Sequence, residues 1–184
     1  GVAFLAELRR AGHECVLFER RGRVGGLWTN PGDVPYLSLQ VVARHYRFPD
    51  FPWPAEASAG RSARPTAEQV LAYVEAYVTH AGLWPHIRLN APVRTVVEGD
   101  DDAVLVAVED GAPLAFDLAV CTGESSVPNV PPVYAAAGVA VHTSALSARR
   151  IAEAKGKRCV VVGGSKSAAD AAIHLDRAGA DVTW

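Results

Sequence analysis

The sequence contains no methionine among its 184 residues, so it has no initiator residue. It begins at Gly1 directly on a helical pattern and ends at Trp184 inside a strand-like run. We therefore expect a fragment from which both ends of the parent protein are missing. A targeting signal on the lost amino terminus would escape notice in such a fragment.

Cysteine is scarce, and no apolar run approaches the roughly 20 residues needed to cross a bilayer. The three cysteines, Cys15, Cys121 and Cys159, are far apart, and each lies inside an apolar run. This pattern predicts buried thiols in a reducing compartment rather than a disulfide framework. We therefore expect a cytoplasmic protein with no membrane segment in this part of the chain.

Neither sign of charge is in excess, since 18 Lys and Arg residues stand against 20 Asp and Glu residues, for a net charge of −2. A nucleic-acid partner would require a basic patch, and none is visible in the sequence, so no nucleic-acid binding is expected. Hydrophobic residues make up 49% of the chain, which is enough to build an ordinary globular core.

The first third of the chain reads as a helix, a strand and a long loop. A helix is predicted over residues 2–11, with Gly12 as its stop, and a buried strand over residues 14–19. Residues 20–65 are rich in Gly, Pro and Arg, with aromatic residues interleaved. Irregular segments of this length are uncommon in compact domains and are usually functional.

A second helix and a small sheet follow this loop. Thr66 begins the helix and Gly82 ends it. Turn residues then separate three strand-like runs, which predict an antiparallel meander over residues 87–98, 103–110 and 112–123.

After a proline-containing linker, a second α/β unit begins at Arg158. It consists of a strand, a helix over residues 166–178 and a final strand at the carboxyl end of the chain. Two similar strand-and-helix units therefore bracket the chain, which indicates two nucleotide sites.

The first candidate site rests on Gly1 and Glu19. In a dinucleotide-binding βαβ unit, a glycine turn precedes a helix whose N-terminus faces the pyrophosphate, and an acidic residue about 20 positions later holds a ribose. Gly1 precedes a helix, and Glu19 ends the next strand at that spacing. A carboxylate there would repel a 2′-phosphate, so FAD or NAD is favoured over NADP. The alternative is an ordinary βαβ turn with a solvent-exposed glutamate.

The run FERRGRVGGLW, residues 18–28, resembles the segment after the second strand of flavin-containing monooxygenases. Physically, Gly25 and Gly26 let the backbone pass close to a phosphate, and Leu27 and Trp28 can cover an apolar ring system. The alternative is a glycine turn with a core tryptophan. The resemblance implies that these four residues bind FAD, and we also assign Val93 to the flavin site.

Residues 37–54, LSLQVVARHYRFPDFPWP, hold four large aromatic residues and three prolines. A rigid, apolar and irregular segment of this kind suits a lid over a planar cofactor, although a proline-rich loop packed on the core is the alternative. The segment resembles the family's Phe-x-Asp-Phe-Pro-x-Pro pattern. That resemblance implies that Gln40 contacts the flavin and the nicotinamide, and has a catalytic role in protecting the oxygenated flavin. The family commonly has a polar pair after this position, whereas Val41 and Val42 stand here.

The second candidate site is the run CVVVGGSKSAAD, residues 159–170, which has strand, glycine turn and helix in order. A lysine in the first helical turn opposes the helix dipole, and a bound phosphate would reverse that unfavourable sign. The alternative is a solvated lysine. The run resembles the Gly-x-x-Lys-Ser-Ala-x-Asp version of the family's nicotinamide site, which implies NADPH binding by Gly163, Lys166, Ser167, Ala168 and Asp170.

Between the two sites, the resemblance to the family's Cys-Thr-Gly segment implies backbone contact with FAD at Thr122 and Gly123. The family's Phe-x-Gly-x-x-x-His-x-x-x-aromatic fingerprint is half present. Its glycine and histidine stand at Gly138 and His142, but Leu146 replaces the final aromatic residue. His142 is therefore either a positioning residue or a packed histidine. Leu146 also argues mildly against the Baeyer–Villiger branch of the family.

The resemblance to flavin-containing monooxygenases covers the whole chain and implies an α/β fold with two Rossmann-like dinucleotide-binding domains. We expect residues 1–130 to be a partial FAD domain with a small antiparallel meander, and residues 131–184 to begin an inserted NADP domain. The resemblance implies that NADPH reduces FAD and that a flavin hydroperoxide passes one oxygen of O₂ to a nitrogen, sulfur or ketone substrate. The flavin does this chemistry, so no metal site is predicted.

Two alternatives remain. A two-nucleotide reductase without oxygenase activity shares the same plan, but a disulfide reductase needs a redox cysteine pair, and the cysteines here are isolated. An inactive flavin-binding remnant is the other, because the isolated fragment lacks its first strand and most of the nicotinamide domain. We expect the fragment alone to be inactive.

Overall fold

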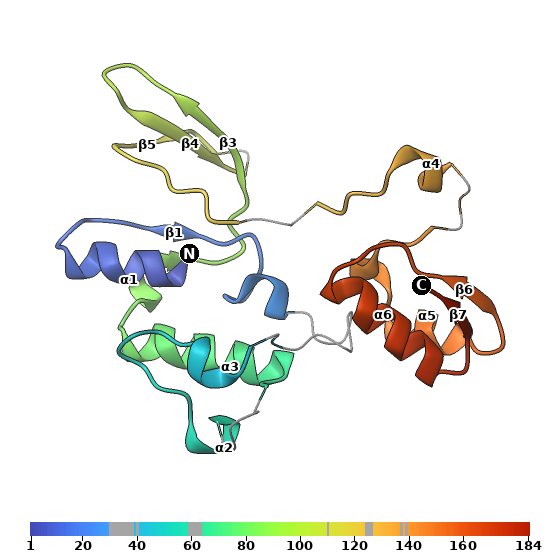
Figure 1. Ribbon diagram of the computed structural model, residues 1–184. Coiled ribbons are helices and arrows are strands. Elements are labelled where there is room, and N and C mark those ends of the chain that lie inside the picture. The colour runs from blue at the N-terminus through green and yellow to red at the C-terminus, as the bar shows by residue number, and fades with distance from the viewer. Residues whose placement is uncertain are drawn as a thin grey trace. The chain divides into compact units, whose positions relative to one another are not determined.

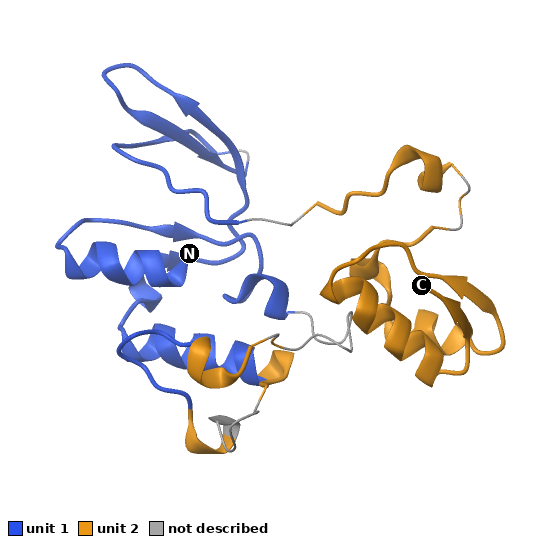
Figure 2. Ribbon diagram, in the orientation of Figure 1, with its two compact units in different colours: residues 1–29, 47–53, 69–124 blue, residues 30–46, 54–68, 125–184 orange. Residues whose placement is uncertain are grey.

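The computed structural model describes two compact units of mixed α/β structure (Figure 2). The first contains residues 1–29, 47–53 and 69–124, and the second contains residues 30–46, 54–68 and 125–184. The described residues are 1–29, 39, 41–58, 64–109, 111–123, 127–136, 138 and 140–184.

The first unit begins with a helix and a short parallel strand pair (Figure 1). Helix α1 (Val2–Arg10) buries Leu5 and Ala6, and it ends where Gly12 adopts φ +86°, as predicted. Strand β1 (Leu17–Phe18) pairs in parallel with β2 (Ile87–Arg88). The predicted strand over 14–19 is therefore real but has only two laddered residues.

Helix α3 (Ala67–His80) supplies much of the core of this unit. Val70, Tyr77 and Val78 are almost completely buried. Gly82 takes φ +65° just beyond the helix, which explains why the helix ends there. At the start of the helix, two hydrogen bonds lower the pKa of the Glu68 carboxyl. The larger effect comes from the backbone N–H of Glu68 itself, and the smaller from the Thr66 hydroxyl.

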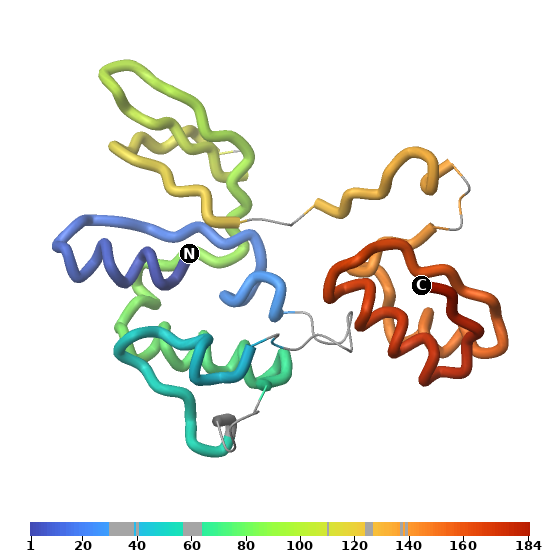
Figure 3. Tube along the Cα trace, viewed as in Figure 1, coloured from blue at the N-terminus to red at the C-terminus, as the bar shows by residue number. Residues whose placement is uncertain are grey.

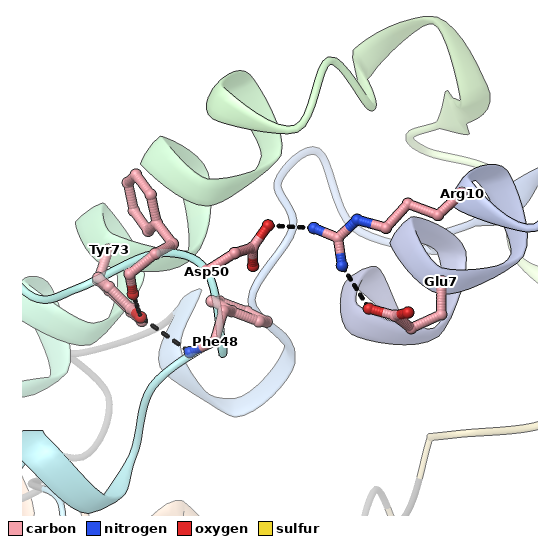
Figure 4. Close-up of polar contacts among 6 residues, drawn as sticks. Glu7, Arg10, Phe48, Asp50 and Tyr73 are labelled. Carbon is pink, nitrogen blue, oxygen red and sulfur yellow. Dashed lines mark hydrogen bonds and ion pairs between the residues drawn. The ribbon is translucent and has the colours of Figure 1, made fainter.

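The aromatic segment over residues 47–53 packs on α3. The Phe48 ring stacks on Tyr77 with ring centroids 3.6 Å apart, and Trp53 stacks on Tyr73 at 4.0 Å. Figure 4 shows the Asp50 carboxylate of this segment directed at the Arg10 guanidinium of α1, with which it forms an ion pair. The aromatic side chains of this part of the predicted lid thus pack on α3, with Trp53 buried and Phe48 and Phe51 half-buried.

Three strands form an antiparallel meander that is easily followed in Figure 3. They are β3 (Val93–Glu98), β4 (Val104–Val108) and β5 (Leu114–Phe116). The meander was predicted, but the first predicted strand over 87–98 is wrong as a single element. Asn90 takes φ +53° and Pro92 follows, so residues 87–88 pair with β1 and only residues 93–98 join the meander.

The second unit contains the strand-helix-strand motif predicted from Arg158 onward. Strand β6 (Arg158–Val160) pairs in parallel with β7 (Asp181–Thr183), and α6 (Lys166–Arg177) connects them. Ala154, Leu175 and Ala180 form its small core. The remaining elements are short: η1 (Gly26–Thr29), η2 (Ala43–His45), α2 (Ala55–Ser58), η3 (Trp84–His86), α4 (Pro132–Ala135), η4 (Thr143–Ala145) and α5 (Ala148–Glu153).

All three cysteines are free, as predicted, but the prediction that all are buried is wrong, because Cys121 is exposed and the other two are half-buried. The apolar run that contains Cys121 is extended chain beyond β5 rather than a covered strand. None of the helices in the described part of the chain combines the length and the apolarity that crossing a membrane would require.

Candidate functional site

In the first unit, two segments far apart in sequence meet at the start of α1. A Cβ atom placed on Gly1 would lie 3.1 Å from Leu17 Cδ1 and 3.5 Å from Thr122 Oγ1. A larger residue would crowd the Leu17 side chain, so a glycine favours this close approach of the helix start to β1, which is the role of the last glycine in a dinucleotide-binding turn. The first backbone N–H groups of a helix lack partners within it and carry partial positive charge.

Glu19 follows β1 directly, two residues beyond Leu17, whose side chain lies at this helix start. Burial lowers the pKa of the Gly1 amino group, and the Glu19 carboxylate opposes part of that effect. Glu19 Oε1 accepts a hydrogen bond of 2.9 Å from the backbone N–H of Arg21. A carboxylate has about four acceptor positions, so one such bond leaves capacity for further donors.

The predicted glycine turn packs against α3. Gly25 has φ +118°, which strains any residue with a Cβ atom, and a Cβ there would lie 2.7 Å from Leu71 Cδ1, so the Leu71 side chain of α3 would have to move. Gly26 has φ +55° and open space around it. The segment is also held by a two-point ion pair between Arg23 and Glu75, with Nε–Oε1 at 2.9 Å and Nη2–Oε2 at 3.0 Å.

The other residues predicted to bind the flavin lie in two separate elements, η1 and β3. Leu27, in η1, is 61% exposed, and Trp28 beside it is half-buried. Val93 is 41% exposed and begins β3, where it pairs with Val108. Leu27 thus presents an exposed apolar side chain directly after the glycine turn.

Thr122, Gly123 and Gln40 are the remaining residues predicted for the flavin site. Thr122 and Gly123 are both exposed, and a Cβ on Gly123 would meet no atom within 4 Å. Their backbone is therefore accessible beside Gly1. Gln40, the predicted catalytic residue, lies outside the described residues.

In the second unit, the predicted nicotinamide residues surround the start of α6. Gly163 has φ +139°, and a Cβ there would lie 3.3 Å from the Ala168 side chain, so the turn and the first helical turn pack closely. Gly163 O also accepts a hydrogen bond of 2.7 Å from the Trp184 indole, which ties the turn to the end of β7. Ser167 is exposed in the first turn of the helix.

Lys166 is the first residue of α6, as predicted, but its ammonium group has a partner within the helix. It forms an ion pair with Asp170 one turn later, and both side chains are about a quarter exposed. From the sequence, the charge of Lys166 was predicted to meet a bound phosphate. In the structure, the Asp170 carboxylate offsets the unfavourable position of the Lys166 charge at the helix start.

His142 has a local role. Its Nδ1 accepts a hydrogen bond from the Ser144 backbone N–H at 3.2 Å and lies 2.8 Å from Ser144 Oγ, so the ring caps η4. Of the two interpretations left open by the sequence, a histidine packed in a structural role therefore fits its described contacts.

One residue of the first unit was not predicted at all. The Arg21 side chain donates to Gly26 O and to the Thr29 hydroxyl, so it spans the glycine turn. Its position between Glu19 and Gly25 was the only signal in the sequence. A basic residue in a loop is usually solvated, and its partners here depend on how the chain folds back.

Comparison with known proteins gives a consistent result. Residues 1–184 match the family described as pyridine nucleotide-disulphide oxidoreductase. The indole-3-pyruvate monooxygenase YUCCA1 of rice (Oryza sativa subsp. japonica) is 32% identical over 188 residues, covering 98% of this chain and 43% of the rice protein. An FAD-dependent monooxygenase of Pyrenophora dematioidea is 31% identical over 177 residues, covering 88% of this chain and 32% of the fungal protein.

A solved flavin-containing monooxygenase from Stenotrophomonas maltophilia has the same fold, with a TM-score of 0.82 at 23% identity. The superposition covers 99% of this chain and 53% of the bacterial protein. The chain thus spans less than half the length of the two sequence relatives described above.

Proposed function

The chain belongs to the pyridine nucleotide-disulphide oxidoreductase family, and from this premise we propose that it is the nucleotide-binding part of a flavin-dependent monooxygenase that uses FAD, NADPH and O₂. The observation that carries the proposal is the close approach of Gly1 to Leu17 of β1 and to Thr122 in the first unit, with Glu19 following β1 directly. Gly1, Glu19 and Thr122 come from separate segments, and each was assigned to flavin binding from the sequence.

The residues fit FAD by geometry. A Cβ atom on Gly1 or Gly25 would crowd a neighbouring leucine side chain, while the backbone at Gly26 and Gly123 is open. Glycine backbone that must stay close to a ligand has this character. In the proposed site, the start of α1 faces the diphosphate, Glu19 accepts the ribose hydroxyls of the adenosine half, and the Thr122–Gly123 backbone contacts the flavin.

FAD, when bound, supplies the redox chemistry: it takes electrons from NADPH and activates O₂. The protein residues bind and orient the cofactor. Leu27 and Trp28 cover its apolar surface, and Val93 contacts it from the start of β3. Gln40 is assigned from the resemblance alone, as the residue that would contact the flavin and the nicotinamide and protect the oxygenated flavin. The substrate is a small molecule that accepts oxygen at nitrogen, sulfur or a ketone carbon.

NADPH is assigned to the second unit, which would begin the NADP domain. The start of α6 faces its phosphates, and the glycine turn at Gly163 lets the backbone approach them. Lys166 must exchange Asp170 for a phosphate oxygen, or share its charge between the two, when the nucleotide binds.

The decisive experiment is a titration of the purified protein with FAD, followed by visible flavin absorbance. We expect the wild type to bind FAD and the Glu19→Ala variant to bind it about 10–100-fold more weakly, because charge-assisted hydrogen bonds to the ribose are lost. Glu14→Ala is the matched control, since Glu14 is an exposed carboxylate on the approach to the same strand. A wild-type protein that binds no FAD and gains no thermal stability from it would refute the proposal.

A disulfide reductase would also suit the family description, but its chemistry requires a paired redox dithiol. Cys15, Cys121 and Cys159 are separate in sequence and free in the structure. In the full-length parent protein, steady oxidation of NADPH by O₂ with release of H₂O₂, in the absence of substrate, would support the monooxygenase. Reduction of a disulfide substrate instead would support the reductase.

A further inference from the structure

We propose that Arg21 is a positioning residue that connects the two halves of the flavin site, the ribose-binding carboxylate and the glycine turn. The inference rests on the proposed function, because it concerns the same FAD site. It adds a residue to which the sequence analysis assigned no role.

The backbone of Arg21 is fixed on both sides. Its N–H donates to Glu19 Oε1 at 2.9 Å, and its carbonyl accepts from Asn90 N at 3.0 Å. Two further backbone bonds of 2.9 Å tie Glu19 to Arg88 and Ala91. The Glu19 carboxylate is therefore oriented by Arg21, on a stretch of chain that is laddered to residues 88–91.

The side chain of Arg21 reaches the other half of the site. Its Nη1 donates to Gly26 O at 2.9 Å and also to the Thr29 hydroxyl. The Thr29 hydroxyl itself donates to Gly26 O at 2.8 Å. These three groups form a closed triangle across the turn, so the direction of the Gly26 peptide is set by the guanidinium.

The consequence is preorganisation. A guanidinium is planar and presents its donors in a fixed arrangement, which a flexible ammonium group does not. Arg21 thus holds the Glu19 carboxylate and the Gly25–Gly26 turn in a fixed relative position before FAD binds. Because these groups are already ordered, less conformational entropy is lost on binding. Both side-chain partners are neutral oxygen atoms, so the positive charge also remains available to the diphosphate.

Three variants separate geometry from charge. Arg21→Ala removes both, whereas Arg21→Lys keeps the charge but is one bond shorter and lacks the rigid guanidinium plane, so its ammonium group does not reach Gly26 O and the Thr29 hydroxyl from the same position. Arg20→Ala is the matched control, because Arg20 is the adjacent exposed residue of the same charge. We expect the FAD dissociation constant to rise about tenfold in Arg21→Ala and nearly as much in Arg21→Lys, and to change less than about twofold in Arg20→Ala.

The choice of ligand distinguishes positioning from a general loss of structure. ADP carries the adenosine ribose and the diphosphate, while FMN carries the ring system with a single phosphate and no adenosine. Arg21→Ala should weaken ADP and FAD by similar factors and leave FMN nearly unchanged. A merely structural role would weaken all three ligands together.

The triangle itself is tested by a double-mutant cycle with Thr29→Val. If Arg21 acts through the Thr29 hydroxyl, the double variant should bind FAD about as weakly as Arg21→Ala alone, because neighbours that share one network are not additive. Should Arg21→Ala fail to fold, Arg21→Lys and Thr29→Val still provide the comparison.

Failure of the proposed function and failure of the positioning role of Arg21 would give different binding results. If the wild type does not bind FAD, the proposed function falls. If the wild type binds FAD but Arg21→Ala matches Arg20→Ala, or Arg21→Lys restores wild-type affinity, or the effects of Arg21→Ala and Thr29→Val simply add, then only the positioning role is overturned.

Discussion

The hydroxyl of Tyr73 joins the two ends of one turn in the aromatic segment by accepting a hydrogen bond of 2.9 Å from Phe48 N and donating one of 2.5 Å to Phe51 O. Its ring also stacks on Trp53. One buried side chain of α3 therefore sets the path of residues 48–53 (Figure 4).

Removing this hydroxyl should destabilise the protein. Tyr73→Phe keeps the stacking but leaves Phe48 N–H and Phe51 O without their partner, which costs about 1–3 kcal/mol of unfolding free energy. Urea unfolding followed by tryptophan fluorescence measures the change. Tyr134→Phe, at a residue 42% exposed in α4, is the control and should have almost no effect. Equal changes in the free energy of unfolding of the two variants would show that the hydrogen bonds of the Tyr73 hydroxyl do not stabilise the protein.

Stability should fall at alkaline pH because of the same cluster. Burial raises the pKa of both Tyr73 and Tyr77, and Arg10 only partly opposes this for Tyr77. In the unfolded chain both phenols lose their protons near pH 10. Above that pH the unfolded state binds fewer protons than the folded state, so the free energy of unfolding decreases as pH rises. Unfolding curves at several pH values above 9 should show a shallower decline in Tyr73→Phe; an identical slope would contradict the prediction.

The two glycines of the turn should differ sharply in their tolerance of alanine. Gly25→Ala combines strain at φ +118° with a contact of 2.7 Å to Leu71, and should cost about 2–4 kcal/mol of stability. Gly26→Ala, at φ +55° in open space, should cost about 1–2 kcal/mol. Thermal unfolding of the two variants without ligand tests this order, and a less stable Gly26→Ala would reverse it.

The ion pair at the start of α6 should compete with NADPH. Asp170→Asn releases Lys166, so we expect NADPH to bind about 3–10-fold more tightly, with the gain shrinking as salt is added. Asp176→Asn, at the other end of the same helix, controls for the change in net charge. Lys166→Ala should weaken binding. If Asp170→Asn and Asp176→Asn have the same effect, Lys166 does not contact a phosphate.

Local chemistry made much of the secondary structure predictable. Gly12, Gly82 and Gly179 all take positive φ where helices were expected to stop, because a residue without a Cβ atom adopts that conformation most readily. The resemblance to flavin-containing monooxygenases is likewise confirmed by the sequence relatives, since it depends on short runs of residues in fixed order.

Pairing between strands was less predictable. Residues 87–98 read as one strand-like run, but the partner of residues 87–88 is β1, some 70 positions earlier. Periodicity indicates that a strand exists but does not specify its neighbour. Similarly, the position of Cys121 in an apolar run gave no warning that this segment is exposed.

By itself, the sequence determined the order of helices and strands, the two glycine turns and the acidic residue at the end of the first strand, because these depend on residue conformation and local spacing. Only the tertiary structure decided which groups meet: Gly1 with Thr122, Arg21 with Gly26 and Thr29, and Lys166 with Asp170 rather than with solvent. The physical reason is that hydrogen bonds and ion pairs act over a few ångströms, and the distances between side chains are fixed only when the chain has folded.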